Sequence, residues 1–316
     1  MATRTCLVTG SAGFVGSVLA RTLVSRGWRV VGVDREAVPS WRECPDVSQV
    51  QLDLCDLEAV VALVGETRPE VIFHLAAQPF VPVSVAEPYA TVRDNVLATT
   101  SVLEAARLHG VARVVHASSG AIYGSEPGEH TYFENDEPKV GANLYGPSKI
   151  AAENIVLAYS RTFALDVRIG RFMNTYGPGD TSPSRIVPTA VCQALGGDCY
   201  DFGDRDDGST ALDFVYVDDV VAGYLAAAEV DDGALQGVYN FGTCDPVSVR
   251  DLVCAISRLA DGAEREPVFR GPVADNPRRK CLDAGRARKE LDWEPRTDLM
   301  TGLRETVDWY REHLHA

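Results

Sequence analysis

Along the first 120 residues, short β-branched hydrophobic runs alternate with longer segments that have the hydrophobic spacing of helices. One further helix and one further strand follow. The expected strands cover 5–9, 29–33, 49–52, 71–75, 114–117 and 166–171, and the expected helices cover 16–25, 57–64, 89–109 and 146–163. Short strands separated by helices need right-handed crossovers. The pattern therefore predicts an α/β fold with a doubly wound parallel sheet.

The hydrophobic pattern becomes less regular after Tyr176. Polar segments rich in Gly, Pro or charge predict surface loops at 124–141, 177–188 and 203–210. Helical spacing returns at 218–229, 249–260, 284–291 and 299–313. We expect residues 1–175 to form the sheet domain and residues 176–316 to form mainly a smaller lobe laid over it, with 211–240 returning to the first domain.

Composition narrows the class of protein. The 316 residues are 46% hydrophobic and 24% charged, which is typical of a globular chain and excludes disordered and fibrous classes. No apolar run is long enough for a membrane helix, and no charged leader precedes the first strand, so we expect neither a membrane span nor a signal peptide. The net charge of −15 argues against a nucleic-acid partner, and a phosphorylated substrate would need a locally basic site.

The eight cysteines contain no Cys-x-x-Cys pair, and the chain is too large for a small domain held by disulfides. Packed thiols are the simplest interpretation. The sequence therefore predicts a cytoplasmic protein without a bound metal.

Gly10-Ser-Ala-Gly13-Phe-Val-Gly16 lies between the first expected strand and its helix. Glycines let a backbone turn tightly and approach a pyrophosphate, whose charge then meets the amides of a helix N-terminus. Asp34 ends the second strand, where a carboxylate can accept hydrogen bonds from an adenosine ribose. This combination predicts dinucleotide binding by a Rossmann fold. Asp34 favours NAD over NADP because it would repel a 2′-phosphate, although Arg35 could partly offset that repulsion.

Tyr145-Gly-Pro-Ser-Lys149 forms a second constellation. Proline suits a first helical turn, which places Tyr145 at a helix start and Lys149 one turn later on the same face. A phenol with a pKa near 10 is a poor base at neutral pH, and a lysine ammonium together with an oxidised nicotinamide would stabilise the phenolate. Ser119 follows the strand at 114–117, at the sheet edge where ligands bind, and its hydroxyl can hold the reacting substrate oxygen.

The order of these motifs resembles the extended short-chain dehydrogenase/reductase family, and within it the NAD-dependent epimerase/dehydratase group that acts on nucleotide sugars. The resemblance spans essentially all 316 residues. It also rests on Asp53-Leu-x-Asp56, His74-Leu-Ala-Ala77, Asn95, Arg171-Phe-Met-Asn174, Asp213-Phe-Val-Tyr-Val-Asp218-Asp219, Tyr239-Asn-Phe-Gly242 and Leu291-Asp-Trp-Glu-Pro295.

The resemblance implies a catalytic set in which Tyr145 is the general base, Lys149 adjusts its pKa and anchors the ribose, and Ser119 holds the sugar oxygen. The implied cofactor is NAD, bound by Gly10, Gly13, Phe14, Val15, Gly16, Asp34, Asp53, Leu54, Leu75, Ala76, Ala77, Asn95, Tyr145 and Lys149. The implied substrate is a nucleotide-diphosphate sugar, bound by Gln78, Ser119, Asn174, Arg185 and Arg278. A homodimer formed through the helix at 89–109 and the helix after Tyr145 is also implied.

Departures from the family pattern bear on the reaction. Dehydratases of this group place an acid directly after the Ser119 position, because removing water needs a proton donor, whereas this chain has Gly120 and Ala121. The same two residues disfavour the decarboxylases, and a serine followed by small neutral residues resembles the 4-epimerases. The sequence favours a nucleotide-sugar 4-epimerase. A 4-ketoreductase or dehydrogenase is the alternative, and a non-catalytic dinucleotide-binding protein is a remote one.

Leu212 is a further departure, because relatives carry an arginine there that pairs with the diphosphate. The nucleotide would then either sit differently or rely on Arg205, Arg278 or Arg279. The segment 78–84 resembles that of CDP-glucose dehydratases and hints at a CDP- or dTDP-sugar.

Overall fold

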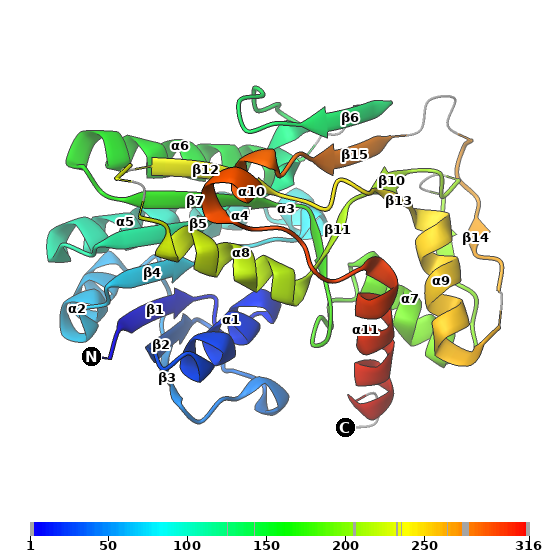
Figure 1. The fold of residues 1–316 in the computed structure, drawn as a ribbon, viewed down its shortest axis with the longest axis horizontal. Helices are drawn as coiled ribbons and strands as arrows, with labels where there is room; N and C mark the ends of the chain where they lie inside the picture. Colours follow the sequence, from blue (N-terminus) through cyan, green and yellow to red (C-terminus); the bar gives the residue numbers. More distant parts are fainter. Residues whose placement is uncertain are drawn as a thin grey trace.

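The computed structural model describes residues 3–124, 126–141, 143–204, 207–231, 233–234, 236–263, 265–273 and 278–313. A seven-stranded sheet lies at its centre, with the order β12-β7-β5-β4-β1-β2-β3 and every neighbouring pair parallel (Figure 1). Its strands are β1 (Thr5–Thr9), β2 (Arg29–Asp34), β3 (Val47–Gln51), β4 (Val71–His74), β5 (Arg113–Ala117), β7 (Val167–Phe172) and β12 (Gln236–Phe241). The strand order reverses between β1 and β4, which confirms the doubly wound α/β fold.

Helices cover both faces of this sheet (Figure 1), and its inner strands β1 and β4 are almost entirely buried. In β1, Cys6 and Val8 face the core beneath α1 (Phe14–Ser25) and α8 (Val217–Glu229). Leu7 faces the opposite core. That core lies beneath α2 (Leu57–Thr67), α5 (Ala98–His109) and α6 (Tyr145–Phe163). The alternation of strand side chains thus fixes two separate apolar layers.

The helix expected at 89–109 is not uniform. The structure has α4 (Pro88–Val92), a π-helical turn (Arg93–Leu97) and then α5, and a short helix α3 (Val81–Ala86) precedes them. A π-helical turn changes the direction in which its side chains point relative to the flanking α-helix, and such turns often occur at functional sites.

A further core in the C-terminal half joins α7 (Ile186–Leu195), α9 (Val249–Asp261) and α11 (Leu299–His313). Two small parallel sheets pair β8 (Asn174–Tyr176) with β11 (Phe214–Tyr216), and β9 (Asp201–Gly203) with β14 (Val268–Phe269). A four-stranded sheet has the order β13 (Val247–Ser248), β10 (Ala211–Leu212), β15 (Arg279–Leu282) and β6 (Glu129–Tyr132). The helix α10 (Gly285–Leu291) follows β15.

Two of the expected loops are partly wrong. Within 124–141, β6 forms and pairs with β15, so a polar segment of the first half becomes an edge strand of the second sheet (Figure 1). Within 177–188, α7 already begins at Ile186. Both errors arise because partners distant in the sequence stabilise these segments, and local polarity does not report such partners. No helix in the described ranges is long and apolar enough to cross a membrane.

Candidate active site

A cavity of about 830 Å³ lies at the carboxyl ends of the central strands, at the point where the strand order reverses. This is where ligands bind in doubly wound sheets. Its wall contains most of the residues expected to hold the cofactor: Gly10, Gly13, Phe14, Val15, Gly16, Asp34, Asp53, Leu54, Leu75, Ala76, Ala77, Tyr145 and Lys149.

The glycine loop requires glycine for steric reasons. Gly10 has φ of +75°, and a Cβ on it would lie 2.8 Å from the Ala76 nitrogen, while a Cβ on Gly16 would lie 2.0 Å from the Gly10 oxygen. Gly13 caps α1 and has no side chain to occupy the first amides of the helix. The loop therefore leaves a narrow cradle beside a helix N-terminus, which suits the pyrophosphate of a dinucleotide.

Carboxylates stand at the adenosine end of this cavity. Asp34 accepts hydrogen bonds from the Ala12 and Glu36 backbone nitrogens at 3.0 and 3.1 Å, and its remaining lone pairs suit two ribose hydroxyls. A hydrogen bond from the Cys55 backbone lowers the pKa of Asp53, so that carboxylate stays ionised. These carboxylate acceptors fit the ribose hydroxyls of NAD.

The three expected catalytic residues form two contacts around the start of α6. Tyr145 is half-buried and hydrogen-bonded to Ser119, whose Oγ also accepts from the Ala121 nitrogen at 3.1 Å. Lys149 is buried and donates from Nζ to the Ala117 oxygen at 2.8 Å. Ser119 therefore both caps the turn at Gly120–Tyr123 and contacts the phenol.

The pKa values of Tyr145 and Lys149 are set mainly by burial in this structure. Burial raises the pKa of Tyr145, and the Ser119 hydrogen bond and the charge of Arg185 oppose that rise. Burial also lowers the pKa of Lys149 to about 8, with nearby Glu153 acting in the opposite direction. Lys149 is not among the groups that shift the Tyr145 pKa in this structure, and its ammonium group donates to the Ala117 carbonyl; its expected effect together with NAD stays a prediction.

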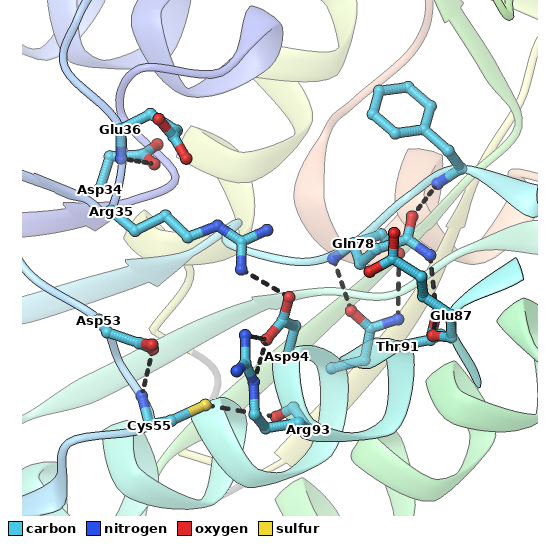
Figure 2. Close-up of polar contacts among 12 residues, drawn as sticks. Asp34, Arg35, Glu36, Asp53, Cys55, Gln78, Glu87, Thr91, Arg93 and Asp94 are labelled. Carbon is cyan, nitrogen blue, oxygen red and sulfur yellow. Dashed lines mark hydrogen bonds and ion pairs between the residues drawn. The ribbon is translucent and has the colours of Figure 1, made fainter. Parts of the chain in front are cut away.

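The remaining expected residues are divided among several places. Gln78 lines the cavity, but its side chain is bonded to Thr91 Oγ1 and to the Phe80 nitrogen (Figure 2). Asn95 lies behind the wall and bonds both Gln78 and Ser148, which ties the loop after β4 to α6.

Of the three expected phosphate-end residues, Arg185 lines the main cavity and pairs with Asp180 at 3.3 Å. Asn174 is exposed on β8 and donates to the Asp213 oxygen. Arg278 lines a second cavity of about 770 Å³, together with Arg279. The structure therefore does not gather these three residues around one cavity, and Arg205 lies outside the described residues.

Two cations that sequence reasoning missed, one half-buried and one buried, hold the walls of the site. Arg42 lines the main cavity and donates to the oxygens of Ala12 and Gly179, both at 2.6 Å. Lys280, on β15, donates to the oxygens of Gly120 and Gly124 at 2.7 and 2.8 Å. Lys280 thereby fixes the turn that carries Ser119. The basic run at 278–280 was its only signal in the sequence.

Beneath the site, Glu153 accepts from Ser118 Oγ at 2.7 Å and pairs with Arg171 through two hydrogen bonds. Arg171 also donates to Tyr123 Oη at 2.6 Å. Glu153 follows Lys149 by one helical turn, a spacing that could have signalled a shared face.

A Rossmann fold, a glycine cradle beside two carboxylates, and Tyr145 and Lys149 on the wall of the same cavity, with Ser119 bonded to Tyr145, define an enzyme that uses a nicotinamide dinucleotide. The sequence profile of the NAD dependent epimerase/dehydratase family matches residues 6–242. The chain belongs to that family, as its motifs predicted, and its cofactor is NAD.

Individual relatives match along almost the whole chain. The UDP-glucose 4-epimerase of Mycolicibacterium smegmatis is 38% identical over 96% of this chain and 98% of its own. The dTDP-glucose 4,6-dehydratase of Streptomyces antibioticus is 34% identical over 97% of this chain and 92% of its own. The solved structure of MoeE5 in complex with UDP-glucose and NAD is similar with a TM-score of 0.87 and 33% identity, covering 98% of this chain and 99% of that one. The relatives thus include both epimerases and dehydratases.

Proposed function

We propose that this enzyme is a nucleotide-sugar 4-epimerase that keeps its NAD throughout the reaction. The observation that carries the proposal is the neutral turn beside the Ser119–Tyr145 pair. A Cβ on Gly120 would lie 2.5 Å from Met173 Sδ, so a larger residue at that position would require the flexible Met173 side chain to move. Ala121 follows, and its methyl side chain has no ionisable group that could transfer a proton. The acid that a dehydratase needs after its serine is thus missing, whereas an epimerase needs only one proton carrier at C4.

Each catalytic residue has a stated role in this proposal. Ser119 holds the C4 oxygen of the sugar, and Tyr145 removes the proton from that oxygen and later returns it. Lys149 holds the cofactor's ribose with its ammonium group. NAD, when bound, supplies the hydride acceptor and the positive charge that opposes the burial of the Tyr145 phenolate. For epimerisation, the ketone would have to stay in the site, turn its other face to the reduced cofactor and take back at C4 the hydride that it gave up, before it is released.

Retention of NAD has a structural counterpart in Arg42. Its guanidinium joins Ala12 in the glycine loop to Gly179 at the start of the lobe, across the cavity wall. We assign substrate binding mainly to residues 176–316. Among the described residues of 176–316, Arg185 is the cationic side chain that lines the main cavity. The relatives support a nucleotide-sugar substrate, and a thermal-shift series with UDP-, dTDP-, CDP- and GDP-sugars identifies the nucleotide.

The test measures turnover and cofactor content together. The purified enzyme should interconvert a 4-epimeric pair of nucleotide sugars without added cofactor, and denaturation should release NAD. Tyr145→Phe should abolish turnover and leave the NAD content unchanged. Stoichiometric consumption of NADH would instead identify a ketoreductase, and a sugar product lighter by one water in mass spectrometry would identify a dehydratase. An undiminished rate in the Phe variant would exclude Tyr145 as the base.

We also propose that the enzyme is a homodimer. Large apolar side chains lie exposed along neighbouring helices, among them Val85 on α3, Tyr89 on α4, Leu108 on α5 and Phe163 on α6. Pairing these helices with a second copy would bury that surface. Light scattering should give twice the mass of one chain, and Tyr89→Glu should shift the mass towards that of the monomer.

A further inference from the structure

Two arginines meet one carboxylate at the adenosine end of the cofactor cavity (Figure 2). Arg35 follows Asp34 directly in the chain, yet its side chain reaches across to Asp94, with Nη1 2.6 Å from Asp94 Oδ2. Arg93 approaches the other oxygen of Asp94, at 2.7 Å. Asp94 belongs to the π-helical turn, and its side chain is 10% exposed, compared with 46% for Arg35. Both Arg35 and Asp94 line the cavity, whereas Arg93 does not contribute to its wall.

This arrangement bears on which dinucleotide the ribose site accepts. NAD and NADP differ by a phosphate on the 2′-oxygen of the adenosine ribose, and that oxygen is the group that Asp34 is placed to bind. A guanidinium is the side chain best suited to a phosphate, because it can donate two parallel hydrogen bonds to it. Arg35 is adjacent to Asp34 in the chain and is therefore the cation placed to receive such a phosphate.

The contact with Asp94 removes that option. The Asp94 carboxylate pairs with the guanidinium, which extends away from Asp34, as Figure 2 shows. The pKa of Arg35 is raised, chiefly by its hydrogen bond to Asp94, so the cation is held more firmly by this pair. A 2′-phosphate bound at Asp34 would then meet the negative charge of that carboxylate while Arg35 is turned away from it.

We propose that Asp94 is a specificity-determining residue for the cofactor, which keeps the ribose site selective for NAD by holding Arg35 away from Asp34. The proposal concerns the dinucleotide alone and holds for any sugar and any reaction of this family. Selectivity against NADP is then the work of two carboxylates, one that repels the phosphate directly and one that withholds the neighbouring arginine.

The test compares the nucleotide bound by full-length variants. Each purified protein is equilibrated with equal concentrations of NAD⁺ and NADP⁺ in excess, washed and denatured, and the released nucleotides are quantified by liquid chromatography. Asp94→Asn removes the charge and keeps the shape, and we expect the NADP⁺ to NAD⁺ ratio to rise about tenfold, the size of one charge-assisted hydrogen bond to phosphate. Asp94→Ser provides the same comparison with a smaller polar side chain.

Two controls separate this role from a general loss of structure. Arg93→Ala removes the other partner of Asp94 but leaves the Arg35 contact, so it should keep the wild-type ratio. The double variant Arg35→Ala with Asp94→Asn should also return to the wild-type ratio, because no cation is then released. A ratio within twofold of wild type in both folded Asp94 variants would overturn the proposal. So would an equal rise in the double variant, which would show that Arg35 is not the group that receives the phosphate.

Discussion

His74 ends β4 just before Leu75 and Ala76, which line the cavity and are expected to contact the cofactor, and it is fully buried. Its Nδ1 lies 2.8 Å from Thr9 Oγ1 and its Nε2 lies 2.9 Å from Thr99 Oγ1. Burial, with a smaller contribution from the charge of Lys149, lowers the pKa of His74 from 6.5 to about 3. Between these two values the unfolded chain binds a proton that the folded chain does not bind. The free energy of unfolding therefore falls as the pH falls through this window.

The size of the effect follows from the pKa difference. Each pH unit inside the window changes the free energy of unfolding by about 1.4 kcal/mol. Acidification from pH 7 to pH 5 crosses about 1.5 units of the window, so His74 alone should lower stability by about 2 kcal/mol. His116 is also buried, with its ring centroid 5.4 Å from that of His74, and burial lowers its pKa as well. The wild-type protein should therefore lose more than the contribution of His74.

Urea unfolding at pH 7 and pH 5 measures this loss. His74→Asn should be less stable than wild type at pH 7, because the new side chain cannot reach both threonines. Its stability should nevertheless fall by about 2 kcal/mol less between the two pH values. His109→Asn, at an exposed position on α5, is the matched control and should keep the wild-type pH dependence. If His74→Asn showed the full wild-type difference between pH 7 and pH 5, the buried neutral ring would not be its cause.

Two further predictions concern buried charges around the site. Arg171→Met leaves the buried Glu153 carboxylate with Ser118 as its remaining hydrogen-bond donor among those described. The free energy of unfolding, measured in urea at pH 7, should therefore fall by about 3–5 kcal/mol. A loss below about 1 kcal/mol contradicts this prediction. Burial lowers the pKa values of Lys280 and Lys149 to about 8, so turnover should fall as pH rises through about 8 and both ammonium groups lose their protons. Lys280→Arg keeps the positive charge, so turnover should fall less steeply with pH on the alkaline side of the pH profile. Lys280→Met should lower kcat about tenfold and leave the NAD content unchanged. An unchanged alkaline side of the profile in the Arg variant contradicts this role of Lys280.

Features that depend on neighbouring residues in the chain could be predicted from the sequence. The glycine cradle needs only a strand, three glycines and a helix in succession, and the structure shows the steric reason at Gly10 and Gly16. Asp34 follows from the length of β2, and Tyr145 and Lys149 follow from the spacing of one helical turn. Each of these residues lines the same cavity.

Features that depend on distant partners could not be predicted in this way. Thr131 of β6 pairs with Cys281 of β15, 150 residues later in the chain. Local polarity made the first segment look like a loop. That pairing also carries Lys280 to the turn after Ser119, so the role of Lys280 depends on a strand that the sequence pattern did not indicate.

The net charge of this acidic chain does not show how its cavity could attract a phosphate. Arg35 and Arg185 both line the cavity, but each lies against a carboxylate, Asp94 and Asp180 respectively. Arg42 differs, because its two terminal nitrogens donate to neutral carbonyl oxygens, one of them in the glycine loop itself. Its positive charge is therefore less fully compensated at close range than theirs. Together with the backbone amides at the start of α1, Arg42 gives the glycine loop a positive electrostatic field within a chain of net charge −15. A count of the charged residues in the sequence does not reveal this local field.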